Sequence, residues 1–321
     1  MISRRYILLS SVTTSLLPRS LRAETYPSKP IRIIVPFGPG SATDQVARIV
    51  AAEIASASGQ PVIVDNRAGA EGQIGAQAAA QSPPDGYTLF FTTQTTQAAN
   101  PAVYRTLQYD PIRSFAPISG LTRGAQIVLV RNELGVRTIS DLIALAKREP
   151  GKITFGSGNG SSRAGGELFK VMAGVDMTHV PYRSQPQAIQ DLIGGIVDVV
   201  FSDFLAALPS VEANRIRAIA VTSSQRSRAL PEVPTVHEAG VPGYEMWAWT
   251  ASYAPAGTPQ PILDQLNRWI VAAMKSATIV KIVEQTAGET FAGAPAELAA
   301  FQSREIEAWR LLVTRAGMQA P

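Results

Sequence analysis

The chain of 321 residues contains no cysteine and only two histidines, His179 and His237. Without a thiol there is no cysteine nucleophile, no cysteine metal site and no cysteine that could carry a lipid anchor. Neither histidine stands in an H-E-x-x-H pattern, and neither G-x-S-x-G nor G-x-x-x-x-G-K-[ST] occurs. These absences argue against the common hydrolase, metalloprotease and nucleotide-binding classes. We therefore expect no enzyme activity, no catalytic residue, no bound metal and no cofactor.

Charge is also sparse, because only 17% of the residues are Asp, Glu, Lys or Arg. The formal net charge of +4 comes from the start of the chain. Residues 1–23 hold four of the 29 basic residues and none of the 25 acidic ones, so the remainder carries 25 of each sign. A neutral body without a basic run has no electrostatic attraction for a phosphate backbone. We expect no nucleic-acid partner.

No stretch of the sequence approaches the length of a membrane span. Residues 1–23 are instead typical of an export signal, with Arg4 and Arg5 ahead of a short apolar stretch at residues 6–17. Residues 21–23 (LRA) offer a cleavage site that would make Glu24 the new N-terminus. These features predict a periplasmic protein. Both the general secretory and the twin-arginine export routes fit the paired arginines.

Short β-branched apolar runs alternate with helical patterns, which predicts an α/β fold. The first strand is expected at Ile31–Val35 and is followed by a turn and then a helix that Ser41 opens, with Asp44 completing a capping box. Further strands are predicted at residues 62–64, 87–91, 127–130, 153–155, 177–180, 197–201, 216–221 and 251–254. A final helix is predicted over residues 295–315. A chain of this length suits two lobes better than one core.

Two loops in different parts of the chain share one design, in which a buried strand ends in Gly, Ser or Thr and a helix begins at once. Such a junction directs free backbone N–H groups and the positive end of a helix dipole toward the strand's carboxyl end. Neither loop has the G-x-G-x-x-G spacing of a dinucleotide site. The pattern predicts a ligand with one or two carboxylates, held by Gly38, Gly40, Ser41 and Thr43 in the first loop and Ser157, Gly158, Gly160, Ser161 and Ser162 in the second.

The chain closely resembles the substrate-binding proteins of tripartite tricarboxylate transporters, the Bug receptors. The resemblance extends from about Tyr26 to the C-terminus and is carried by an ordered series of segments. These are residues 29–40 (KPIRIIVPFGPG), 65–70 (DNRAGA), 84–89 (PDGYTL), 109–111 (YDP), 179–182 (HVPY), 192–195 (LIGG), 230–235 (LPEVPT), 238–240 (EAG) and 254–259 (APAGTP).

The resemblance implies a type II periplasmic binding protein fold, in which two α/β lobes close on a ligand about a hinge. Residues 24–124 and 246–321 would form lobe 1, and residues 125–245 lobe 2. The first-lobe site would comprise Phe37, Gly38, Pro39, Gly40, Ser41, Ala42, Thr43, Thr92, Thr93, Gln94 and Thr95. The second-lobe site would comprise Ser157, Gly158, Asn159, Gly160, Ser161, Ser162, Arg163, Pro181, Tyr182, Phe201, Ser202 and Asp203.

The implied function is a monomeric receptor for a small carboxylated metabolite, either an amino acid, a di- or tricarboxylate or an aromatic acid, with membrane transporter subunits as partners. Three positions depart from the family pattern. Ser41 replaces a usual Gly, Arg163 lies near a frequent His, and Ser202 stands where Asp is common. Arg163 would either pair with a ligand carboxylate or face solvent, and Asp203 has the same open choice. Two other functions remain, a receptor that feeds a two-component sensor and an enzyme acting on an organic acid.

Overall fold

A computed structural model describes residues 26–285 and 288–318. The predicted export signal, residues 1–23, lies outside the described residues. Within them, no helix combines the length and the apolar character needed to cross a bilayer.

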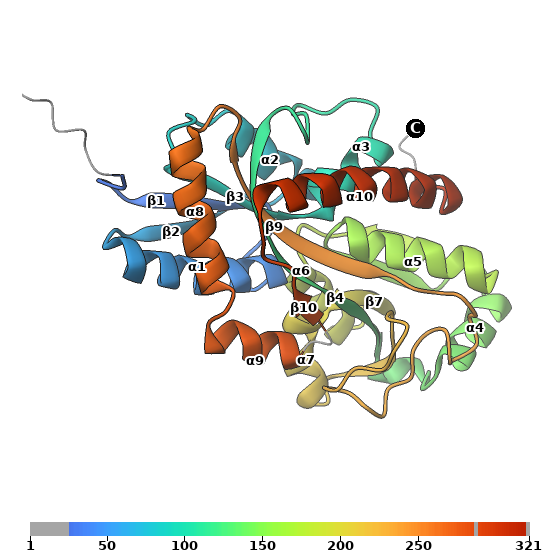
Figure 1. The fold of residues 1–321 in the computed structure, drawn as a ribbon. Helices are drawn as coiled ribbons and strands as arrows, with labels where there is room; N and C mark the ends of the chain where they lie inside the picture. Colours follow the sequence, from blue (N-terminus) through green and yellow to red (C-terminus); the bar gives the residue numbers. More distant parts are fainter. Residues whose placement is uncertain (1–25, 286–287, 319–321) are drawn as a thin grey trace, which may run out of the picture.

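The strands form one mixed sheet that is continuous through its longest member (Figure 1). Its path runs β2-β1-β3-β9-β4-β7-β5-β6, and β8 and β10 pair with β4 beside this path. The strands are β1 (Ile31–Val35), β2 (Val62–Asn66), β3 (Thr88–Thr93), β4 (Phe115–Arg131), β5 (Thr154–Ser157), β6 (Thr178–Pro181), β7 (Val199–Asp203), β8 (Ile216–Val221), β9 (Trp247–Pro255) and β10 (Gly288–Thr290).

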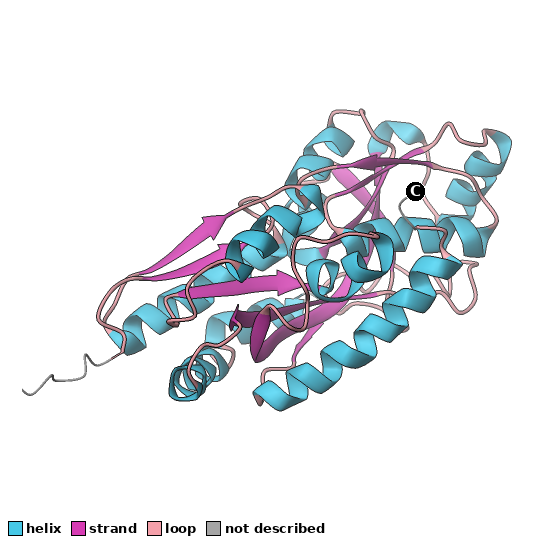
Figure 2. Ribbon diagram, turned by 90° about the horizontal axis from the view of Figure 1, so that it is seen from above, coloured by secondary structure: helices cyan, strands magenta, loops and turns pink. Residues whose placement is uncertain are grey.

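Helices cover both faces of this sheet (Figure 2). They are α1 (Ala42–Ser58), α2 (Gln73–Ala80), α3 (Asn100–Val103), α4 (Ile139–Arg148), α5 (Gly160–Ala173), α6 (Gln185–Ile193), α7 (Phe204–Glu212), α8 (Gln260–Ala273), α9 (Ala277–Gln285) and α10 (Pro295–Arg315). Short helical turns lie at Ala70–Gly72, at Thr95–Ala99 directly before α3, and at Asn132–Leu134.

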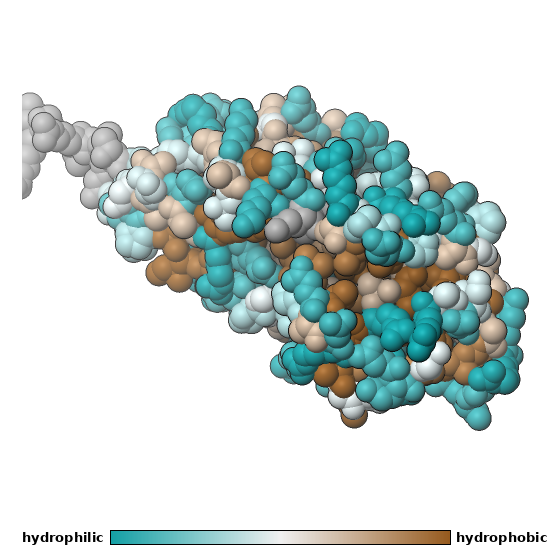
Figure 3. All heavy atoms as spheres, turned by 90° about the horizontal axis from the view of Figure 1, so that it is seen from below, coloured by the Kyte–Doolittle hydropathy of each residue, from teal (hydrophilic) through white to brown (hydrophobic). Residues whose placement is uncertain are grey.

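The sheet has two halves, each built on a parallel block, and β4 belongs to both. In the first half β2, β1 and β3 are parallel, and in the second half β7, β5 and β6 are parallel. Strand β4 pairs antiparallel with β9 up to Ala125 and with β7 from Gln126 onward. The outline of the molecule is notched between the two halves (Figure 3). The change of partner at Ala125 and Gln126 therefore marks the crossing between the halves.

Three groups of buried apolar side chains hold the layers together. One lies between the first half, α1 and α8, and includes Ile33, Val50 and Leu266. Another lies between the second half, α6 and α7. The largest extends across both halves beneath α5 and α10, with Phe155 and Trp309 among its members. Helix α10 contacts β4, the turn at Thr95–Ala99 and α3, and it also contacts α5. It therefore links the two halves of the sheet on one face.

Most sequence predictions of regular elements are confirmed. Strand β1 and helix α10 have the predicted bounds, and Val46, Val50 and Ile54 form the buried stripe of α1. The helix α7, the turn at Thr95–Ala99 and the first part of β4 were not predicted. Pro209 lies inside α7, and Pro117 and Gly120 interrupt the apolar pattern of β4, so the usual signs of a helix and a strand are weak there.

Candidate functional site

Three helices from both halves of the sheet begin at one cavity. They are α1, α5 and α7, with 17, 14 and 9 residues, and residues from the start of each line the cavity. The first N–H groups of a helix have no partner within the helix, and the helix dipole makes that end positive. The cavity has a volume of about 60 Å³ and is partly open to solvent. This arrangement suits an anion or another strong hydrogen-bond acceptor.

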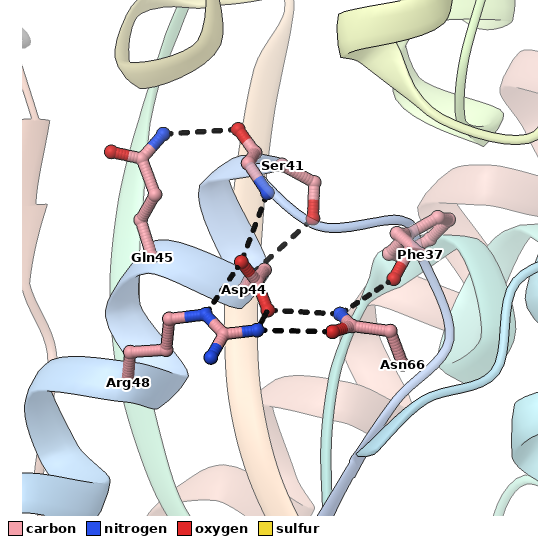
Figure 4. Close-up of polar contacts among 7 residues, drawn as sticks. Phe37, Ser41, Asp44, Gln45, Arg48 and Asn66 are labelled. Atoms are coloured by element: carbon pink, nitrogen blue, oxygen red, sulfur yellow. Dashed lines mark hydrogen bonds and ion pairs between the residues drawn. The ribbon is translucent and has the colours of Figure 1, made fainter. Parts of the chain in front are cut away.

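Asp44 fixes the start of α1 against the sheet (Figure 4). Its carboxylate accepts hydrogen bonds from Gly40 N, from Arg48 and from Asn66 Nδ2, and Ser41 Oγ accepts from Asp44 N at 3.3 Å. Burial alone would raise the pKa of this carboxyl, but these hydrogen bonds and the charge of Arg48 hold it below its ordinary value. Asp44 is therefore occupied in building the loop and does not face a ligand as a free acid.

Gln94 supplies the first half with a side chain that is only partly satisfied. It is 0% exposed and lines the cavity between Thr93 and the turn that precedes α3. Its Oε1 accepts a hydrogen bond from Trp249 N at 2.7 Å, whereas Nε2 has no partner among the described residues. The neighbouring Thr93 Oγ1 accepts from Thr95 N at 3.1 Å. The first-half wall thus presents an amide donor and a threonine hydroxyl.

Asn159 and Ser161 form the corresponding wall at the start of α5. Asn159 caps the helix, because its Oδ1 accepts from Ser162 N at 2.9 Å and from Ser161 Oγ at 2.8 Å. Its Nδ2 donates to Asp203 Oδ2 at 3.3 Å. Gly158 lies outside the cavity lining, and a Cβ there would collide with the backbone of Ser184 and Gln185. Gly158 is thus required by the close approach of α6.

Asp203 ends β7 and lines the cavity at the start of α7. Its side chain makes no cap bond to that helix, and Asn159 is the one side chain found donating to it among the described residues. Burial raises the pKa of this carboxyl from its ordinary value to about 6. Asp203 is therefore a partly buried acid with little compensation, and it lines the cavity.

The two halves touch each other around the cavity, so the arrangement is closed. Gly160 N donates to Thr95 Oγ1 at 2.9 Å, and Gln45 Nε2 donates to the carbonyl of Leu205 at 3.2 Å. Arg163 lies 3.3 Å from Glu71 and also donates to the Met318 carbonyl. These contacts join segments far apart in the sequence and narrow the way into the cavity.

Seven of the predicted binding residues line the cavity together: Ala42, Thr43, Thr93, Gln94, Asn159, Ser161 and Asp203. The other predicted residues lie in the supporting loops outside the lining: Phe37, Gly38, Pro39, Gly40, Ser41, Thr92, Thr95, Ser157, Gly158, Gly160, Ser162, Arg163, Pro181, Tyr182, Phe201 and Ser202. Several of these have identified protein partners. Tyr182 Oη donates to Asp191 at 2.8 Å, and Arg163 pairs with Glu71 rather than facing the cavity.

Sequence reasoning missed part of the wall. Trp249 of β9 is buried and lines the cavity. Residues of β4, α7, β9, α9 and β10 complete the lining: Thr122, Arg123, Gly124, Ala125, Phe204, Leu205, Ala248, Thr250, Ile282, Val283 and Gly288. An apolar residue near a chain crossing carries no motif, so these positions become visible only in the fold.

His179 lies away from the cavity lining, in agreement with a structural role. Its Nε2 is 2.6 Å from Ser157 Oγ, and its ring packs against Phe155. Burial, together with the charges of Arg163 and Lys170, lowers its pKa to about 4, so the imidazole is neutral in the folded protein. Among the described residues no group of three or more His, Cys, Asp or Glu side chains is arranged to hold a metal ion.

The model of the tripartite tricarboxylate transporter family receptor matches residues 46–318. The chain belongs to this family. It is 35% identical to an R. palustris protein solved with adipate, with a TM-score of 0.88 over 91% of this chain and 98% of that one. It is 29% identical to the periplasmic binding protein BugD, with a TM-score of 0.87 over 92% of this chain and 99% of that one. MatC from Rhodopseudomonas palustris, solved with bound malate, is 30% identical, with a TM-score of 0.84 over 90% of this chain and 100% of MatC.

These comparisons confirm the α/β fold of a periplasmic binding protein and the Bug-receptor resemblance. The family and its solved relatives are binding receptors.

Proposed function

We propose that this protein is an exported receptor that captures a small carboxylate in the cavity by closure of two lobes. Residues 24–124 and 246–321 would form lobe 1, and residues 125–245 would form lobe 2. The hinge lies where β4 changes partner, at Ala125 and Gln126, and where β9 begins at Trp247. The loaded, closed form would then be recognised by membrane subunits of a tripartite transporter.

The convergence of the starts of α1, α5 and α7 on one cavity carries this proposal. Each start contributes positive potential and N–H donors, and the three come from both sides of the proposed hinge. An anion between them would be contacted by both lobes at once, which favours the closed form. The adipate and malate present in two solved relatives agree with this class of ligand.

Neutral donors dominate the cavity wall, which is consistent with reversible capture. Thr43, Thr93, Gln94, Asn159 and Ser161 are all uncharged, so the ligand's carboxylate group would be held by hydrogen bonds and not by a cationic side chain. A fully buried ion pair carries a large desolvation cost when it forms. The neutral donors of the cavity wall are already out of water in the folded protein, so this cost does not arise again on binding. A receptor that must release its ligand to a transporter benefits from this balance.

A thermal-shift screen of the protein from Glu24 onward tests the proposal, with a panel of small carboxylates and their matched primary amides. Ligand at about 100 times its dissociation constant stabilises the folded state by about 2.7 kcal/mol. We expect at least one acid to raise the melting temperature while its amide does not. A rise with a sugar or a nucleotide, or no rise with any acid, would overturn the proposal.

A further inference from the structure

Gln94 and Asp203 present opposite chemistry to the same cavity from opposite halves of the sheet. Trp249 N donates to Gln94 Oε1, and a backbone N–H needs an acceptor, so this contact fixes which end of the amide is the nitrogen. Gln94 Nε2 then remains a buried donor for which the described residues supply no acceptor. A buried donor without an acceptor carries a desolvation cost. A ligand oxygen that reached Nε2 from the cavity would remove that cost.

Asp203 has the complementary requirement, because it is an acceptor with one long hydrogen bond from Asn159 at 3.3 Å. Its pKa of about 6 leaves it mostly ionised at neutral pH. A second carboxylate placed beside it would add a like charge in a desolvated place, which is unfavourable. An ammonium group there would supply both hydrogen bonds and the opposite charge.

The rest of the lining offers little to a second ligand carboxylate. Arg123 is the one Lys or Arg among the residues that line the cavity, and its Nε is hydrogen-bonded to Glu289. Phe204, Ile282 and Val283 make part of the wall apolar. The cavity lining thus combines a donor, Gln94, with an acid, Asp203, and with several apolar side chains. This combination matches a small zwitterion with a hydrocarbon part.

We propose that the ligand is an amino carboxylate, whose carboxylate oxygen accepts from Gln94 Nε2 and whose ammonium group donates to Asp203. This inference rests on the proposed capture of a carboxylate and narrows its ligand class. It separates this chain from its relatives solved with adipate and malate, which are dicarboxylates without an amino group.

Matched sets of probes test the inference by calorimetric titration of the purified protein. Each set pairs an amino acid with its deaminated analogue: 5-aminopentanoate with pentanoate, L-leucine with 4-methylpentanoate, L-phenylalanine with 3-phenylpropanoate, and L-glutamate with glutarate. Glutarate also serves as the dicarboxylate of the same length as 5-aminopentanoate. We expect at least one amino member to bind at least ten-fold more tightly than its deaminated partner.

Two variants assign the contacts. Asp203→Asn should weaken binding of the amino member at least ten-fold and leave the deaminated acid equal or tighter. Gln94→Glu keeps the acceptor for Trp249 N but replaces the donor by an anion, so it should weaken every carboxylate. Asp176→Asn is the matched control, because Asp176 is 66% exposed and lies outside the cavity lining. It should leave all affinities unchanged, and the melting temperature of each variant reports folding.

The outcomes separate the two proposals. If glutarate or another acid without an amino group binds most tightly, and Asp203→Asn strengthens it, the amino-carboxylate inference is wrong while carboxylate capture stands. If no acid binds in any set and the wider carboxylate panel is also silent, both proposals fail.

Discussion

Two aspartates stand beside helix starts on opposite sides of the cavity, and their surroundings differ sharply. Asp44, in the first turn of α1, receives hydrogen bonds from a guanidinium, an amide and a backbone N–H, and its pKa is lowered (Figure 4). Asp203, immediately before α7, receives one long hydrogen bond from Asn159, and burial raises its pKa. Burial favours a raised pKa at both acids, and only at Asp44 do enough donors surround the carboxylate to reverse the shift.

The same contrast separates two uses of charge in this molecule. Arg48 compensates Asp44 within one helix, and Arg163 compensates Glu71 across the two halves of the sheet. Both pairs maintain the shape around the cavity. Within the part of the chain that the structure describes, Asp203 has no such cation, so its ionisation costs stability in the absence of ligand. Functional sites often retain groups that the fold alone would stabilise better in another form.

Removal of the Asp44 carboxylate should produce the largest effect. Asp44→Ala leaves Arg48, Asn66 Nδ2 and Gly40 N without their acceptor at the start of α1. We expect a loss of about 3 kcal/mol in the free energy of unfolding, since breaking a compensated buried ion typically costs that much. Urea unfolding measures it. Asp176→Asn, at an exposed site, should change the value by less than about 0.5 kcal/mol. If Asp44→Ala lost no more stability than Asp176→Asn, the contacts of Asp44 would not stabilise the fold. The contrast between Asp44 and Asp203 would then disappear.

Removal of the Arg48 guanidinium should make the pKa of Asp44 more like that of Asp203. Arg48→Met keeps the aliphatic stem but deletes the guanidinium that contacts both Asp44 and Asn66. Because the Arg48 side chain is 53% exposed, we expect a loss of only about 0.5–1 kcal/mol. The pKa of the Asp44 carboxyl should rise in the variant, which carboxyl NMR titration detects. A pKa that does not move would mean that Gly40 N and Asn66 alone set it.

The fold around Asp44 was predictable because its signals are local. Ser41 and Asp44 are three residues apart, and Val46, Val50 and Ile54 recur along one helix face, so the start of α1 is legible in the sequence. Gly40, whose φ is 79°, marks the left-handed turn before it. That Gln94 and Asp203 line one cavity was implied by the family resemblance and not by a local pattern. It depends on β4 and β9 carrying the chain between halves and on α7, whose internal Pro209 hides the helix.

The partners of some residues in the fold differ from what their residue type suggests. Arg163 has the right chemistry for a ligand carboxylate, yet Glu71 and the Met318 carbonyl occupy it. Trp249 has no motif, yet its backbone N–H orients Gln94 and its side chain lines the cavity. Residue type indicates what a side chain is able to bind, whereas its partners in the fold decide what remains for the ligand.

Neutralisation of Asp203 should have the opposite sign to that of Asp44. Asp203→Asn keeps the size of the side chain and removes a desolvated charge, so we expect a gain of about 1 kcal/mol at pH 7 in ligand-free protein, a figure reduced for partial solvent screening. Thermal and urea unfolding both report it. A loss comparable to that of Asp44→Ala would show that Asp203 is structurally compensated, and would count against its assignment to a ligand.

The pH dependence of this gain gives the smallest signal and the sharpest separation of the two acids. The folded pKa of Asp203, about 6, exceeds the ordinary value of 3.8, so between these limits the folded state binds more protons than the unfolded state. Stability of the parent protein therefore falls as pH rises through this window. The advantage of Asp203→Asn should be complete above pH 6 and vanish below 3.8.

For Asp44 the sign is reversed, because its folded pKa is lowered. Its contribution is present above the unfolded value of 3.8 and is lost as pH falls through the folded pKa. Unfolding of both variants and the parent across this range, taken as differences, cancels the titration of the remaining groups. An advantage of Asp203→Asn that does not change with pH would place its cause in packing rather than in charge.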